Sequence, residues 1–70
     1  MNRQVVSSSN VLTVGYDAAT ATMEVEFTSG AIYQYFDVPQ AVHEAVVGSA
    51  SVGLTLNQMV KGQFRYARIQ

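Results

Sequence analysis

The sequence predicts an α+β domain in which an antiparallel sheet of about four strands is covered on one face by two short helices. Residues 21–27 alternate between apolar and polar side chains, the pattern of a half-buried strand. Pro39 and Gly48 bracket an apolar repeat of helical spacing, and a second such repeat ends before Gly62. Aromatic segments with strand character lie before and after these helices, which gives the order β-β-β-α-α-β.

Length and composition restrict the function classes. Seventy residues predict a single domain over residues 1–70, and the apolar fraction of 49% is typical of a folded chain. The chain has no cysteine and one histidine, so we expect no disulfide, no metal site and no cofactor. It begins without an apolar signal segment and has no apolar run of membrane-spanning length, so we expect a cytoplasmic protein without membrane contact.

The first long strand is expected at residues 11–16, after a short leading segment at residues 4–7. Its alternation places Leu12, Val14 and Tyr16 toward the core. A four-residue turn at 17–20 would pair Tyr16 with Ala21, which begins the next strand. Phe27, at the end of that strand, is then expected in the core beside Leu12 and the helices.

The loop before the third strand, residues 31–36, allows two registers. A two-residue turn at 29–30 would place Tyr33 and Tyr35 on the outer face. A three-residue loop at 28–30, with Gly30 in the left-handed position, would pair Val25 with Tyr33 and place both tyrosines under the helices. We favour the second register because glycine as the third loop residue suits the bulged loop and because it leaves Gln34 exposed.

Both helices show one apolar stripe. The first stripe comprises Val42, Ala45 and Val46, and His43 falls away from it into solvent. The second helix begins after Ser49 or Ser51, and its stripe comprises Val52, Leu56, Met59 and Val60. The last strand is expected at residues 63–69.

No group of residues predicts an enzyme. Glu24 and Glu26 point the same way from one strand, but an exposed carboxylate pair is typical of a solubilising sheet face. The serines have no oriented base in the sequence, and no glycine-rich phosphate loop occurs.

The basic residues gather at the end of the chain. Residues 61–70 carry a net charge of +3, whereas residues 1–60 carry −4. Lys61, Arg65 and Arg68, with Arg3, are candidates for contacts to RNA phosphates. Tyr33, Tyr35 and Tyr66 are candidates for stacking on unpaired bases, although the favoured register makes the first two core residues.

The favoured register also predicts an apolar strip on the outer sheet face. Ile32, Phe36, Val11 and Ile69 would lie there beside Thr13. An exposed strip of this kind is typical of a surface for a protein partner or a homodimer. A protein-interaction module is therefore the alternative to an RNA-binding one.

An ordered set of residues resembles the KTSC family. The set comprises Ser8-Ser9-Asn10, Gly15-Tyr16-Asp17, Phe27, Gly30, Tyr33-Gln34-Tyr35, Val38-Pro39, Ala50-Ser51-Val52-Gly53, Asn57 and Tyr66. This resemblance implies a small domain that occurs free-standing in bacteria and at the C-terminus of some lysyl-tRNA synthetases, with RNA binding as its suggested role. The chain departs from the family pattern at Leu56 and Phe64, where an aromatic residue and a tyrosine are expected.

Overall fold

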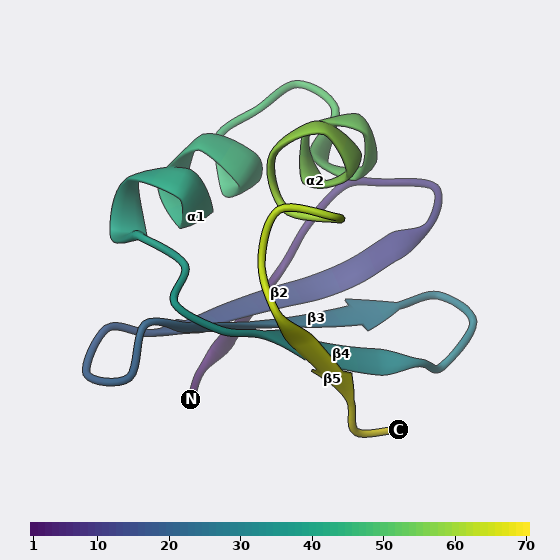
Figure 1. The fold of residues 1–70 in the computed structure, drawn as a ribbon. Coiled ribbons are helices and arrows are strands. Elements are labelled where there is room, and N and C mark those ends of the chain that lie inside the picture. The colour runs from purple at the N-terminus through teal and green to yellow at the C-terminus, as the bar shows by residue number, and fades with distance from the viewer.

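Five antiparallel strands make up the sheet in the computed structural model, which describes residues 1–70. The spatial order is β1-β2-β3-β4-β5, and the helices α1 and α2 lie between β4 and β5 in the chain. The elements are β1 (Arg3–Val5), β2 (Val11–Asp17), β3 (Thr22–Phe27), β4 (Ile32–Tyr35), α1 (Gln40–Val47), α2 (Val52–Met59) and β5 (Tyr66–Arg68). Both helices cover the same face of the sheet (Figure 1), which confirms the α+β class; β1 adds a strand to the four expected.

The β3–β4 hairpin has the favoured register. Val25 pairs with Tyr33 and Met23 with Tyr35. Gly30 has a φ of +95° and its amide donates to the Phe27 carbonyl, so the loop closes over three residues as expected. This register places Tyr35 in the core under the helices.

The β2–β3 hairpin is shifted by two residues from the prediction. Tyr16 pairs with Met23, not with Ala21. Ala21 has a φ of +53° and belongs to the turn, so β3 begins one residue later than expected. The shift is of two residues, so the apolar faces still coincide.

The beginning of β2 departs from strict alternation. The pairing register shifts between Val11 and Thr13, so Val11 turns into the core and Leu12 faces solvent. The prediction that Leu12 is buried and Val11 is outside was therefore wrong, because a β-bulge places an extra residue on one strand.

The helices bury fewer residues than their stripes predict. Val46, Val52, Leu56 and Val60 are buried, as expected. Ala45 and Met59 are exposed, contrary to the prediction. A helix of eight residues has about two turns, so one row of side chains accounts for most of its contact with a sheet.

The centre of the outer sheet face is polar, and Val5 at its edge is exposed. Arg3 Nε lies 3.3 Å from Glu24 Oε2, and Arg3 Nη1 lies 3.5 Å from Glu26 Oε1. Gln34 Nε2 donates to Glu24 Oε1 at 2.9 Å. Ile32 is only 9% exposed and Val11 is in the core, so the predicted apolar strip does not exist as one surface.

Candidate nucleic-acid interface

One cleft is lined by aromatic rings and two basic side chains. It lies where the β3–β4 hairpin, the segment after α2 and β5 meet, and its volume is about 600 Å³. We call it the aromatic cleft; it is lined by Phe27, Ser29, Ala31, Tyr33, Tyr35, Lys61, Gly62, Tyr66 and Arg68. Five of the residues predicted for RNA contacts thus gather in one place, and no acidic residue lies among them.

The three tyrosines form one stacked group. Tyr35 pairs with Tyr66 across β4 and β5, and Tyr33 precedes Tyr35 by two residues on the same face. The Tyr33 ring centroid lies 5.6 Å from that of Tyr66 and 6.3 Å from that of Tyr35. Tyr35 is 3% exposed and belongs to the core, whereas Tyr66 is 60% exposed. The group is therefore anchored at Tyr35 and open to solvent at Tyr66.

Phe27 forms the other aromatic side of the cleft. Its ring meets Tyr33 edge to face, with the centroids 5.6 Å apart. Lys61 Nζ lies 4.9 Å from the centroid of the Phe27 ring, a cation–π distance. Phe27 packs against the core but is only half-buried, and Leu12 is exposed, so the predicted burial of Phe27 beside Leu12 was wrong. Sequence reasoning also missed the Phe27–Lys61 contact, because it joins segments that are distant along the chain.

The other two predicted phosphate contacts lie elsewhere. Arg65 Nη2 lies 2.8 Å from Asp37 Oδ2, and the Arg65 guanidinium is 5.8 Å from the centroid of Phe36, outside the aromatic cleft. Arg3 is paired with glutamates on the outer face of the sheet. Lys61 and Arg68 are thus the Lys and Arg side chains that pair with no Asp or Glu side chain.

Tyr35 is the cleft tyrosine whose pKa is shifted by its surroundings. Burial raises the pKa of the Tyr35 phenol above its ordinary value, and the neighbouring Tyr33 and Tyr66 raise it further. The hydroxyl therefore keeps its proton at neutral pH. The charge of the cleft comes from Lys61 and Arg68 alone.

His43 lies outside this site but is not the solvated residue that the sequence predicts. Its ring stacks on Tyr16, with centroids 4.8 Å apart and planes 16° from parallel. The Tyr16 hydroxyl donates to the Val38 carbonyl. His43 Nδ1 is buried without a hydrogen-bond partner, and burial lowers the pKa of the imidazole, against a smaller opposing effect of Glu44. The helical periodicity missed this contact because Tyr16 reaches across from β2.

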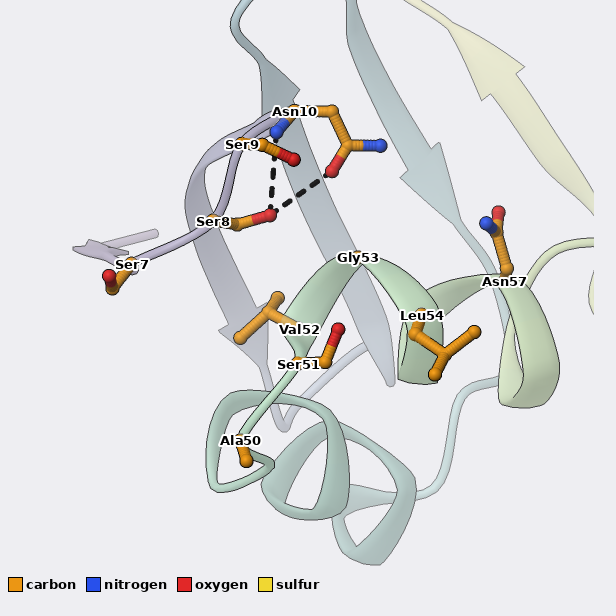
Figure 2. A pocket seen from close by; sticks show the side chains of 10 residues that line it. All are labelled: Ser7, Ser8, Ser9, Asn10, Ala50, Ser51, Val52, Gly53, Leu54 and Asn57. Atoms are coloured by element: carbon orange, nitrogen blue, oxygen red, sulfur yellow. Dashed lines mark hydrogen bonds between the residues drawn. The ribbon is translucent and has the colours of Figure 1, made fainter.

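A second cleft, of about 590 Å³, separates the loop at residues 7–10 from the beginning of α2 (Figure 2). Ser8 Oγ donates to Asn10 Oδ1 at 3.1 Å and accepts from the Asn10 amide at 3.4 Å. A Cβ at Gly53 would lie 2.5 Å from Asn10 Oδ1, so a larger residue at this position would displace the Asn10 side chain. We call this the polar cleft; it contains no charged residue and is lined by Ser7, Ser8, Ser9, Asn10, Ala50, Ser51, Val52, Gly53, Leu54 and Asn57.

Two further features bear on the kind of site. No three His, Asp or Glu side chains come together as metal ligands would. Neither helix is long and apolar enough to cross a bilayer.

Comparison with known proteins gives consistent matches over most of the chain. The profile of the KTSC domain matches residues 7–64. An uncharacterized protein of Stutzerimonas stutzeri is 43% identical over 70 residues, which cover 99% of each chain. The crystal structure of a KTSC domain protein from Yersinia pestis superposes with a TM-score of 0.95 at 35% identity, covering 99% of this chain and 97% of that one.

A further group of relatives is much longer. The lysine–tRNA ligase of Nostoc punctiforme is 37% identical over 54 residues. These residues are 77% of this chain but only 10% of the ligase. The similarity therefore concerns one small part of that enzyme.

Proposed function

The chain belongs to the KTSC domain family, and we propose that it is a binding module for unpaired RNA whose contact surface is the aromatic cleft. One observation carries the proposal: the exposed ring of Tyr66 lies in the same cleft as Lys61 and Arg68, with no acidic residue among them. Aromatic faces beside basic side chains are the usual means by which proteins hold single strands.

The chemistry of the cleft favours unpaired bases over a duplex. A base that is free of its partner can stack on an aromatic ring, and such stacking contributes about 1–3 kcal/mol per base. The bases of a double helix are already stacked on one another, so Tyr66 could reach only phosphates and sugars there. Lys61 and Arg68 would meet the phosphates next to the stacked base.

The longer relatives support the same class of ligand. By their name, the lysine–tRNA ligases act on tRNA, and they contain a segment similar to this chain. The net charge of −1 argues against strong binding to nucleic acid in general. We therefore expect weak binding that is confined to one site.

The test is equilibrium binding of a labelled single-stranded RNA of about 12 nucleotides, measured by fluorescence anisotropy at low salt. Tyr66→Ala should weaken binding about tenfold, and Tyr66→Phe should keep most of the affinity because the ring remains. Arg68→Gln should also weaken binding. Arg65→Gln is the control, because it removes the same charge from a residue outside the cleft.

Circular dichroism would verify that each variant is folded. The proposal fails if the parent does not bind at low salt. It also fails if Tyr66→Ala and Arg68→Gln bind as well as Arg65→Gln does.

A further inference from the structure

We infer that the aromatic cleft takes a single unpaired nucleotide with its two flanking phosphates, not a run of stacked bases. This inference rests on the proposed function and specifies its ligand. It follows from the number of free ring faces, the number of basic side chains and the size of the cleft.

The aromatic group offers one free surface for stacking. Tyr35 is 3% exposed, so its ring is not available to a ligand. Tyr33 is enclosed by three other rings, those of Tyr35, Tyr66 and Phe27, at centroid distances of 5.6–6.3 Å. Tyr66 is the exposed member, and its inner side rests on Tyr33. One base can therefore stack on the group.

The remaining aromatic face is taken by a cation. Lys61 Nζ lies 4.9 Å from the Phe27 ring centroid, on the part of the cleft formed by the hairpin. A second base at Phe27 would have to displace this ammonium group. The contact instead places Lys61 where it can meet a phosphate at one side of a base that stacks on Tyr66.

Two charges match two phosphates. Arg68 shares its face of β5 with Tyr66, two residues away, and its Nε donates to a main-chain oxygen of Gln70 at 3.0 Å. The other guanidinium nitrogens of Arg68 carry no protein hydrogen bond. Lys61 and Arg68 are the two basic side chains of the cleft, so it can neutralise two phosphates, and the binding constant should depend on salt with a slope of about −1.4 in log–log form.

The volume of the aromatic cleft agrees with the binding of one nucleotide. About 600 Å³ lies within the range of pockets that hold one small ligand. Gly62, with a φ of +80°, places no side chain in the cleft. The space therefore accommodates one nucleotide.

The test is a length series of oligoadenylates, together with adenosine 3′,5′-bisphosphate as a competitor of a labelled single strand. The bisphosphate should displace the strand. Affinity per site should change less than about threefold from two to about 12 nucleotides, with the salt slope given above. Tyr66→Ala should weaken the bisphosphate and the strand by the same factor, and Tyr66→Phe should restore both.

The opposite outcomes separate this inference from the proposed function. If affinity rises tenfold or more with length and the slope is steeper than about −3, the cleft binds a run of nucleotides; RNA binding then stands and the single-nucleotide inference is wrong. Failure of the bisphosphate to compete also contradicts the inference alone. If no strand binds at any length, the proposed function is wrong and the inference falls with it.

Discussion

Gly30 and Gly53 are both favoured by the fold, but for different physical reasons. Gly30 has a φ of +95°, and a Cβ built there would touch nothing within 4 Å. Glycine is therefore favoured at this position only because of the backbone conformation. At Gly53 the constraint is one of contact, because a Cβ there would lie 2.5 Å from Asn10 Oδ1 and would displace the Asn10 side chain. The sequence signals the first kind of glycine through loop length, whereas the second depends on a contact between distant segments.

The conformational role of Gly30 can be tested by substitution. Gly30→Val should lower the free energy of unfolding by more than about 1 kcal/mol, because a β-branched residue resists positive φ. Gly30→Asn should cost less, since asparagine tolerates left-handed conformations. Urea denaturation of both variants measures the difference. Equal stability of the valine variant and the parent would mean that the bulged loop is not the hairpin connection.

His43 gives the domain a specific response to acid. Its folded-state pKa lies below its ordinary value of about 6.5, because burial disfavours the charged imidazolium, against a smaller opposing effect of Glu44. The unfolded chain therefore binds the proton more readily than the folded one. The free energy of unfolding should fall as the pH drops through about 6.5 and toward the lower folded-state pKa.

The matched variant for this effect is His43→Phe, which keeps a ring against Tyr16 and cannot titrate. Denaturation midpoints at about pH 7.5 and 5.5 should differ less for the variant than for the parent. The same pH dependence in both proteins would show that His43 is not the group responsible.

At the scale of elements, the helices hold the sheet through a few positions. Val46 on α1, and Leu56 with Val60 at the end of α2, are essentially without solvent contact. The apolar periodicity identified these three residues but also included Ala45 and Met59, which face solvent. Periodicity gives the direction of a stripe, whereas its width depends on how far the sheet extends beneath the helix.

Two leucines on α2 provide a controlled test of this packing. Leu56 is 1% exposed and Leu54 is 55% exposed, so the same chemical change can be compared at a core and a surface position. Leu56→Ala should cost about 2–5 kcal/mol of unfolding free energy. Leu54→Ala should remain within about 0.5 kcal/mol of the parent. Equal costs, measured by thermal or urea denaturation, would mean that α2 packs by another face.

The strands show where sequence reasoning succeeds and where it does not. The β3–β4 register followed from Gly30 and the loop length, because local turn geometry determines it. The bulge that buries Val11 and exposes Leu12 has no local signal, since both residues are apolar. The β2–β3 turn was misplaced because the positive φ of Ala21 is unusual for an alanine.

At the scale of the whole molecule, the fold determines which basic side chains have an acidic neighbour. Arg3 and Arg65 are paired with Asp or Glu side chains, whereas Lys61 and Arg68 are not, in a chain with net charge −1. The sequence identified all four as one candidate set, because net charge along the chain does not say which bases have acidic neighbours. Only the fold brings Lys61 and Arg68 to the three tyrosines.

The most direct measurement is a titration of the ¹⁵N-labelled domain with single-stranded RNA at low salt. Amide nitrogen–proton correlation spectra are recorded at each RNA concentration. The largest shifts should fall on the backbone around the aromatic cleft, at Tyr33, Lys61, Gly62 and residues 66–68. The amides of Ser8, Asn10 and Gly53 in the polar cleft serve as the internal comparison, and their chemical shifts should not change. Shifts centred on the polar cleft, or none at any RNA concentration, would contradict the assignment of RNA binding to the aromatic cleft.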